Sequence, residues 1–378
     1  MKNRYRAAFI RGGTSKAIVF HSKDLPPDRA AWDDIFLAAM GTPDSYGRQL
    51  NGMGGGVSSL SKVCVVGPPG VADADVDYTF AQVQIHEAVV DYNGNCGNMS
   101  AAIGPFAVDE NLVDAPRNGE ACVRIHNTNT GKIIRSTFPV ANGQSVVNGD
   151  LSIPGVSGTG APIRLDFLEP GGASTGSLLP TGNVVDSLFL SGEGEFKVSM
   201  IDAANACVFV EASAVGLSGS ESAEDLAARS DVMTLLGELR RHASVAMGIA
   251  PDVKAADLIR TIPFIAVVAA PRETIASDGS TIAASAADLV VRMLSSGQPH
   301  KALPLTASLC TAVAMQIAGS VPSRLADPRR KASALRLAMP SGVLTVAADV
   351  SRGEGGWRAE SGAFYRTSRR LFDGYVYA

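Results

Sequence analysis

The sequence predicts an α+β fold of two similar lobes, and three observations lead to this prediction. The chain has 378 residues, more than a single hydrophobic core usually organises, so two domains are expected. A stretch rich in Gly, Pro, Ser and Thr at 151–186 separates the two halves. Each half also carries strands followed by a helix of small residues that begins at a polar turn, Cys96–Val108 in the first and Thr306–Met315 in the second. We therefore expect domains at 1–185 and 186–378.

Short strands between glycine-rich loops dominate the first half. Apolar, β-branched and aromatic residues predict the strands Tyr5–Ile10, Ala17–Phe20, Lys62–Val66, Tyr78–Tyr92, Ala121–His126 and Ile133–Pro139. One helix follows Pro26-Pro27-Asp28 and ends near Met40, with a glycine directly after it. A second helix runs from Cys96 to about Glu110, and Pro105 inside it predicts a kink or an early end.

Helices are longer in the second half. Strands are expected at Lys197–Ile201, Cys207–Glu211, Ile262–Val268 and Ala334–Val350. The longest helix is expected from Ser222 to Met247, with Glu224 placed to help it start and a glycine after its end. Further helices are expected at Ala284–Ser295 and from about Thr306.

The composition excludes several classes of protein. Thirty-three basic and 37 acidic residues give a net charge of −4, which argues against a broad nucleic-acid surface but allows local basic pockets that bind acids. The five cysteines are scattered without a C-x-x-C pair, and the five histidines form no H-E-x-x-H. Neither a disulfide framework nor a metal site is therefore expected. Since we also find no signal-like or membrane-spanning apolar stretch, we expect a cytoplasmic protein without a metal.

The segment Asn93–Ala102 is the most informative part of the chain. Cys96 lies between glycines and asparagines, directly before a run of small residues that opens a helix. A thiol at a helix start feels the positive end of the helix dipole, and the unpaired N–H groups there can bind an anion. Proton transfer beside a carboxylate requires such an environment. The alternative is a loop around a buried structural cysteine, because most free cysteines are of that kind.

Three further segments offer donors or cations suited to carboxylates, namely Arg11–Lys16, Gly52–Gly56 and His300–Ser308. The first two contain neither G-x-x-x-x-G-K-S/T nor a complete G-x-G-x-x-G signature, so nucleotide binding is not expected. Lys62 follows the glycine segment and begins an apolar strand. Burial at that position would favour the neutral amine, which can act as a base. The alternative is an ordinary surface lysine at a strand end.

Together these segments resemble the methylaconitate and methylitaconate isomerase family, which includes 4-oxalomesaconate tautomerases and belongs to the diaminopimelate-epimerase-like superfamily. The resemblance spans nearly the whole chain and depends on several motifs in the same order. They are RGGTSK at Arg11–Lys16, NGMGGG at Asn51–Gly56, SSLSKV at Ser58–Val63, NGNCGN at Asn93–Asn98, NTNTGK at Asn127–Lys132, LLPTGNVVDSL at Leu178–Leu188, SMIDAAN at Ser199–Asn205 and MPSG at Met339–Gly342.

The resemblance implies two similar lobes, each a curled mixed β-sheet around a central helix, with the active site in the cleft between them. It also implies a cofactor-independent shift of a double bond in an unsaturated di- or tricarboxylic acid. Position by position, Lys62 matches the family's catalytic lysine, and Cys96 matches the cysteine at the helix start of the first lobe. The surrounding anion-binding loops are matched by Ser15, Gly54, Gly55, Asn95, Gly97 and Asn98.

Three positions depart from the related patterns. Diaminopimelate epimerases carry a second cysteine motif in the later lobe, but Cys310 does not lie in a GCGSG context here. A two-thiol epimerisation is therefore disfavoured. Met339 stands where relatives often have histidine, and Ala17 stands where many have glycine, so the choice of substrate stays open.

The resulting hypothesis is a 1,3-allylic isomerase. Lys62 removes a proton from a carbon flanked by a carboxylate and an alkene, and the backbone N–H groups of Gly54–Gly56 and Cys96–Asn98 hold the dienolate. A proton then returns two carbons away, from Lys62 or from Cys96. The remote carboxylates of the substrate are expected to be held by Arg11, Lys16, Lys301 and Ser308.

Two other functions stay open at this point. One is an epimerase or racemase of a carboxylic acid or amino acid that works by proton transfer, and the other is a non-catalytic carboxylate-binding protein on the same scaffold. The expected partner is a small unsaturated polycarboxylate, with no cofactor. Nucleic-acid and membrane partners are not expected, and a homodimer is one assembly that the sequence allows.

Overall fold

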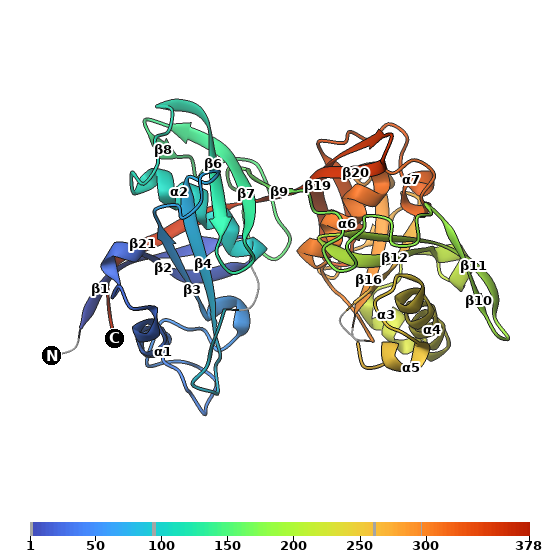
Figure 1. Ribbon diagram of the computed structural model, residues 1–378, viewed down its shortest axis with the longest axis horizontal. Helices are drawn as coiled ribbons and strands as arrows, with labels where there is room; N and C mark the ends of the chain where they lie inside the picture. The colour runs from blue at the N-terminus through green and yellow to red at the C-terminus, as the bar shows by residue number, and fades with distance from the viewer. Residues whose placement is uncertain (1–2, 93–95, 260–261, 296) are drawn as a thin grey trace. The chain divides into compact units, whose positions relative to one another are not determined.

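The chain forms two compact units in the computed structural model, which describes residues 3–92, 96–259, 262–295 and 297–378 (Figure 1). Unit 1 comprises Met1–Leu168 and Tyr365–Ala378, and unit 2 comprises Glu169–Phe364. The boundary after Leu168 falls inside the glycine-rich stretch, earlier than the division at 185/186 expected from the sequence. The last residues of the chain belong to unit 1, because their strand pairs with the first strand.

Unit 1 is a mixed sheet with two helices. Its strands are β1 (Arg4–Gly12), β2 (Ser15–His21), β3 (Lys62–Gly67), β4 (Val76–Val83), β5 (Val90–Asp91), β6 (Asn118–Asn127), β7 (Lys132–Ala141), β8 (Gln144–Ser145), β9 (Ile163–Leu168) and β21 (Ser368–Tyr377). The strands lie in the order β21-β1-β2-β3-β4-β6-β7-β9, with β2–β3 and β4–β6 parallel. The helices are α1 (Trp32–Met40) and α2 (Gly97–Asp109).

The two helices of unit 1 cover opposite faces of its sheet. Ile18 and Phe20 of β2 and Val63 and Val65 of β3 pack in one cluster with the buried side of α1. Since successive side chains of a strand point to opposite faces, the residues between them face the other way. On that face α2 contacts β1, β2, β3, β6 and β7, and Figure 1 shows its ribbon next to β6. Lys62 belongs to this second face.

Unit 2 is also a mixed sheet, with more helix. Its strands are β10 (Asp186–Leu190), β11 (Gly194–Ala203), β12 (Asn205–Glu211), β13 (Phe264–Ala269), β14 (Thr274–Ile275), β15 (Thr281–Ile282), β16 (Leu289–Ser295), β17 (Gln298–Pro299), β18 (Leu335–Met339), β19 (Gly342–Gly353) and β20 (Gly356–Arg366), of which β20 ends in unit 1. Its helices are α3 (Ala223–Ala228), α4 (Ser230–Ala246), α5 (Val253–Ala256), α6 (Leu305–Gln316) and α7 (Val321–Leu325). The sheet order is β10-β11-β12-β13-β16-β18-β19-β20.

The two units repeat one topology. The pairings along β1-β2-β3-β4-β6-β7 alternate between antiparallel and parallel, and those along β11-β12-β13-β16-β18-β19 alternate in the same order. Helix α2 precedes β6 in unit 1, and α6 precedes β18 in unit 2. The prediction of two similar α+β lobes is therefore confirmed, and so is the correspondence between the two helices of small residues.

Two of the predicted helices differ from the structure. The segment predicted as a helix at Ala284–Ser295 is a short 3-10 turn followed by strand β16, because its run of Leu, Val and Met is buried within the sheet. The helix predicted from Ser222 to Met247 breaks at Arg229, whose φ of −86° and ψ of 79° are not helical. Its start is fixed by a capping box between Ser222 and Asp225 rather than by Glu224.

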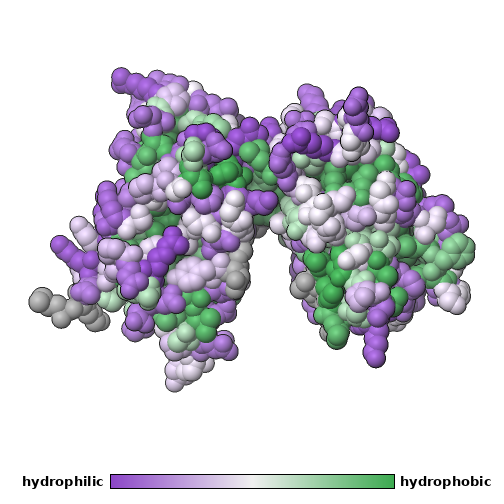
Figure 2. Space-filling model, viewed as in Figure 1, coloured by the Kyte–Doolittle hydropathy of each residue, from purple (hydrophilic) through white to green (hydrophobic). Residues whose placement is uncertain are grey.

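Helix α2 runs through Pro105 without ending early. A proline inside a helix costs about 3 kcal/mol, and the burial of every residue from Met99 to Val108 offsets that cost. Among the described residues, no helix combines the length and the apolarity needed to cross a membrane. On the face of the molecule drawn in Figure 2, hydrophilic residues are widespread and apolar patches lie between them.

Candidate active site

Lys62 is the first residue of β3, and its side chain is only 7% exposed. Its Nζ donates a hydrogen bond to Oε1 of Gln82, the residue opposite it on β4. The same Nζ lies 5.0 Å from the centre of the Phe80 ring. Among the residues that the structure describes, no carboxylate forms an ion pair with it. Lys62 is therefore a buried amine held by a neutral acceptor beside an aromatic ring, which suits a proton-transfer group.

Cys96 is the N-cap residue of α2 and is half-buried. Its side chain makes no capping hydrogen bond, and no other described side chain caps the first N–H groups of the helix. Gly97 and Asn98 begin the helix directly behind it, and no acidic side chain occupies the first turn. An uncapped helix start of this kind attracts anions through its N–H groups and through the positive end of its dipole.

The turn between β1 and β2 packs closely against the first turn of α2. A Cβ on Gly12 would come within 2.6 Å of the Asn98 carbonyl oxygen, and one on Gly13 within 2.2 Å of Asn98 Oδ1. Asn98 Oδ1 accepts hydrogen bonds from the Thr14 N–H (3.4 Å) and from Nε of Arg366 (3.1 Å). Burial lowers the pKa of the Arg366 guanidinium to about 10. These contacts fix the direction in which the helix start points.

Lys62 and Cys96 both lie near the buried thiol of Cys64. Burial raises the pKa of Cys64; the nearby Cys96 raises it further, while the hydrogen bond with Tyr78 and the nearby Lys62 lower it. Cys64 shares the α2 face of β3 with Lys62, two residues away. The amine and the thiol predicted as catalytic are therefore brought to the same face of one sheet.

Ser15 lies on this face as well. Ala17 pairs with Lys62 across the parallel strands β2 and β3, and Ser15 is two residues before Ala17 on the same strand. Ser15 is buried and pairs with Gly12, the residue against which Asn98 packs. Ser15, Gly97 and Asn98 are thus brought together with the two catalytic candidates. Asn95 lies outside the described residues.

The glycine loop differs from the sequence prediction. The N–H of Gly54 donates to the Met40 carbonyl (3.3 Å), and the N–H of Gly56 donates to Oε1 of Gln49 (3.0 Å). These two donors hold the loop to α1 and to Gln49 and are not open for a dienolate, so the prediction that all three N–H groups bind the substrate is wrong. The exposed Gly55 is the exception, because no described residue accepts its N–H.

Two cations of the β1–β2 hairpin were predicted to bind the substrate. Lys16 lies away from Lys62, and Arg11 already donates hydrogen bonds to backbone carbonyls. Lys16 belongs to the opposite face of β2, where its Nζ lies 5.6 Å from the centre of the Phe9 ring in the core under α1. Arg11 donates to the carbonyl oxygens of Gly13 (2.9 Å) and Thr367 (3.0 Å). Burial and the nearby Arg369 lower the pKa of Arg11. The structure gives Arg11 a role in holding the hairpin.

Lys301 and Ser308 belong to unit 2. Lys301 is exposed and forms an ion pair with Glu224 (2.6 Å). Ser308 is fully buried in α6, and its hydroxyl donates to the Leu305 carbonyl (2.7 Å). Their role as contacts for remote carboxylates stays a prediction.

The matching positions of unit 2 carry different chemistry. Strand β13 begins with Phe264 where β3 begins with Lys62, and the N-cap of α6 is Pro304 where that of α2 is Cys96. Cys310 lies inside α6, fully buried, with its Sγ 3.3 Å from the Ile201 carbonyl oxygen. The repeated fold therefore provides the amine and the helix-start thiol in unit 1 and not at the same positions of unit 2.

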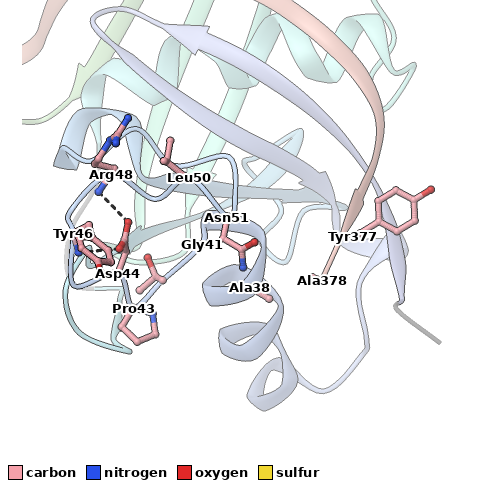
Figure 3. Close-up of a pocket in the computed structure, with 11 residues that line it drawn as sticks. Ala38, Gly41, Pro43, Asp44, Tyr46, Arg48, Leu50, Asn51, Tyr377 and Ala378 are labelled. Atoms are coloured by element: carbon pink, nitrogen blue, oxygen red, sulfur yellow. Dashed lines mark hydrogen bonds between the residues drawn. The ribbon is translucent and has the colours of Figure 1, made fainter.

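A surface pocket of about 630 Å³ lies elsewhere in unit 1, beside the C-terminal end of α1 (Figure 3). Tyr46, Arg48 and Leu50 line it from the loop after α1, and Tyr377 lines it from β21. No residue predicted for the site lines this pocket. We therefore do not assign the chemistry to it. Among the described residues, no group of three or more His, Cys, Asp or Glu side chains is placed to hold a metal ion.

Sequence reasoning missed three residues that organise the site: Gln49, Gln82 and Arg366. Two of them act on partners distant in the sequence, since Gln82 is 20 positions from Lys62 and Arg366 is 268 positions from Asn98. Gln49 bonds nearer residues, among them Gly56, which is seven positions away. The only available signal was the polar Gln82 in the otherwise apolar end of β4.

The chain is similar to proteins of known activity over its whole length. The family model described as PrpF protein matches residues 2–378. The 3-methylitaconate isomerase of Eubacterium barkeri is 41% identical over 99% of this chain and 97% of its own length. The 4-oxalomesaconate tautomerase of Pseudomonas putida is 37% identical over 99% of this chain and 96% of its own. The 2-methyl-aconitate isomerase of Cupriavidus necator is also 37% identical, over 98% of this chain and 96% of its own.

A solved structure agrees with these sequence relatives. The crystal structure of methylitaconate-delta-isomerase has a TM-score of 0.92 and 40% identity to this chain, covering 100% of this chain and 96% of that one. An α+β chain matched from residue 2 to residue 378 by this family model, and by relatives named isomerases, belongs to the PrpF protein family.

Proposed function

We propose that this protein is a cofactor-independent 1,3-allylic isomerase of an unsaturated di- or tricarboxylic acid. The observation that carries the proposal is the common face of Lys62, Cys96 and the uncapped start of α2. An amine that accepts a proton, a thiol that donates one and N–H groups that bind an oxyanion are the parts that a double-bond shift requires. The names of the relatives support the same class of reaction.

The reaction begins with the loss of a proton from carbon. Neutral Lys62 takes the proton from a carbon that lies between an alkene and a carboxylate, and the electron pair spreads over the alkene and the carboxylate oxygens. The developing negative charge is stabilised by the N–H groups of Gly97 and Asn98 at the start of α2, with Gly55 as a further donor. Carbon acids of this kind are weak, so these donors matter as much as the base.

The second step returns a proton two carbons away, which moves the double bond. We assign this proton to the Cys96 thiol, which leaves Lys62 protonated and Cys96 as thiolate until the two exchange protons with water. In the alternative scheme Lys62 returns its own proton on the same face. Atoms and charge balance in both schemes, because the product is an isomer of the substrate.

The proposal is tested by presenting methylaconitate, aconitate, methylitaconate and 4-oxalomesaconate to the purified protein. Proton NMR and ultraviolet absorbance follow the position of the alkene. We expect one or more of these acids to be converted to an isomer with a shifted double bond. Tight binding without any conversion would favour a carboxylate-binding protein, and inversion of a stereocentre without an alkene shift would favour an epimerase.

Location and assembly are proposals of the same kind. A cytoplasmic location is supported by five free cysteines, three of them buried, since free thiols are typical of a reducing compartment. A homodimer is the assembly we propose to test first, by sedimentation of the purified protein.

A further inference from the structure

The orientation of the Gln82 side chain is fixed by its surroundings. Its Nε2 lies 2.9 Å from the Ser61 carbonyl oxygen and 3.1 Å from the Ser58 carbonyl oxygen. A carbonyl oxygen only accepts hydrogen bonds, so the amide nitrogen must face these two groups. The amide oxygen then faces Lys62, whose Nζ donates to it. The amide cannot turn over without placing its oxygen against two other oxygens.

A neutral acceptor has a specific advantage at this position. Both the amine and the ammonium form of lysine can donate a hydrogen bond to an amide oxygen. A carboxylate in the same place would favour the ammonium form, which cannot remove a proton from the substrate. Gln82 therefore holds Lys62 in place without adding a charge that would fix it in its inactive form.

None of the other groups around Lys62 that the structure describes is a carboxylate. Strand β3 supplies the Cys64 thiol, β4 supplies the Tyr78 phenol and the Phe80 ring, and the start of α2 supplies Cys96. Burial raises the pKa of Cys64 and that of Tyr78, so both stay neutral near pH 7. The residues of β2 on this face next to Lys62 are Ser15 and Ala17, which do not titrate.

The support of Gln82 extends to the glycine loop. The Ser61 carbonyl accepts from Gln82, and the Ser61 hydroxyl donates to Oε1 of Gln49 (2.6 Å). The same oxygen of Gln49 accepts the Gly56 N–H, and Nε2 of Gln49 donates to the Thr42 hydroxyl (2.8 Å). The Gln82 amide is thus part of a buried network of hydrogen bonds that includes Ser61 and Gln49. This network keeps Gln82 in place when the Lys62 side chain moves.

We propose that Gln82 is a positioning residue that holds Lys62 toward the substrate through a neutral acceptor and so keeps the amine available as a base. This inference rests on the proposed function. It assigns Gln82 no contact with the substrate.

Two substitutions test the inference. Gln82→Met keeps the length of the side chain but removes the acceptor, and Gln82→Glu replaces the neutral acceptor with a charged one. Gln84 is exposed, two residues further along the chain, so Gln84→Met and Gln84→Glu are matched controls for the change in shape and in charge. For each variant kcat and KM are measured from pH 6 to 10. The Cε resonance of Lys62 is followed over the same range by NMR of protein labelled with ¹³C-lysine.

We expect Q82M to lower kcat by about tenfold or more while KM changes by less than about threefold, because the base is misplaced and the substrate contacts are kept. We expect Q82E to be inactive near pH 7 and to regain activity as the pH rises, with the Lys62 resonance shifting at a higher pH than in the unmodified protein. The inference is overturned if Q82M keeps its kcat, or if Q82E has an unchanged pH profile and an unchanged Lys62 resonance.

Failure of this inference is distinguishable from failure of the proposed function. If the unmodified protein isomerises an unsaturated acid and both Gln82 variants behave like the Gln84 controls, only the role of Gln82 is lost. If the unmodified protein isomerises none, the proposed function fails. The pH at which the Lys62 resonance shifts in the Gln82 variants then still shows whether Gln82 controls the protonation of the amine.

Discussion

At the scale of single residues, the proposed function depends on one amine and one thiol of unit 1. Lys62 is buried, begins a strand and is bound by an amide rather than by a carboxylate. Cys96 caps a helix without using its side chain as the cap. Neither group contributes to structure in the way that lysines and cysteines usually do. Each is therefore available for proton transfer.

Substitution of Lys62 by alanine should remove the base. We expect Lys62→Ala to lower kcat/KM by about 10²–10⁴-fold, the usual contribution of a general base. Lys132 offers a matched control, because it also begins a strand of unit 1 but is exposed. Lys132→Ala should keep its turnover within about twofold of the unmodified protein. Steady-state kinetics on the converted acid measures both, and a Lys62→Ala variant with normal turnover would remove the base from the mechanism.

Substitution of Cys96 by serine separates the two schemes for the second proton. Serine is a favourable N-cap residue, so α2 should be at least as stable in Cys96→Ser as in the unmodified protein. The hydroxyl is a much weaker acid than the thiol, and we expect kcat to fall by about 100-fold or more. Cys122→Ser, at an exposed cysteine, should leave kcat unchanged. Retention of most activity by Cys96→Ser would show that Lys62 returns the proton itself.

At the scale of elements, the turn between β1 and β2 sets the position of α2. Gly13 has a φ of +53°, and a Cβ there would lie 2.2 Å from Asn98 Oδ1. Gly131 has a φ of +67° but nothing within 4 Å of the Cβ position. Both glycines have a positive φ, which other residues rarely adopt, but only Gly13 packs against the start of α2.

Alanine at these two glycines separates backbone strain from displacement of α2. We expect Gly131→Ala to lower the free energy of unfolding by about 1 kcal/mol and to keep its activity. Gly13→Ala should cost more and should lower kcat by about tenfold or more, because it moves Asn98 and the N–H groups behind it. Denaturant unfolding and steady-state kinetics on both variants provide the comparison. Equal effects of the two substitutions on kcat would mean that the turn does not position the helix.

At the scale of the whole molecule, buried thiols make the free energy of unfolding depend on pH. Burial raises the pKa of Cys64 in unit 1 and of Cys207 in unit 2 above the ordinary value of 9.0. The folded protein then keeps protons that the unfolded chain releases, so this contribution is fully present below about pH 9 and is lost as the pH rises above it. Each group should lower the free energy of unfolding by about 1.4 kcal/mol per pH unit in that range.

Thermal and denaturant unfolding between pH 7 and 10.5 measures this dependence. We expect Cys64→Ala and Cys207→Ala to lose less stability per pH unit above pH 9 than the unmodified protein, although both start less stable because of the cavity. The exposed Cys122 shows no such burial, and Cys122→Ser should keep the original slope. An unchanged slope in both alanine variants would mean that these thiols do not control alkaline stability.

The sequence predicted much of the molecule, and the physical limits of that prediction are visible in particular residues. Local patterns pointed to Lys62 and Cys96 as candidates, and they predicted the helix start at Cys96 to within one residue and the repeat of α2 by α6. They failed at β16, where burial in a sheet outweighed an apolar pattern that also fits a helix. They also could not show that Gly54 and Gly56 use their N–H groups within the loop, since Met40 and Gln49 accept them only after folding.

The other contacts that the sequence did not predict join segments that are distant along the chain. Gln82 and Arg366 act on Lys62 and Asn98 through strand pairing and helix packing, and no local spacing indicates either contact. Lys16 follows Ser15 directly, yet it belongs to the other face of the sheet, because neighbouring residues of a strand alternate. Strand alternation could have separated Ser15 from Lys16 in advance. The Gln82 contact required the register of β3 with β4.

The most direct test follows a single proton. The converted acid is incubated in deuterated buffer with the unmodified protein and with Lys62→Ala, and NMR locates the deuterium in the product. We expect the unmodified protein to place deuterium on the carbon two positions from the one that lost its proton, together with a shifted alkene, and Lys62→Ala to place almost none. Deuterium only on the original carbon with the alkene unmoved, or equal labelling by Lys62→Ala, would contradict an allylic isomerase that uses Lys62 as its base.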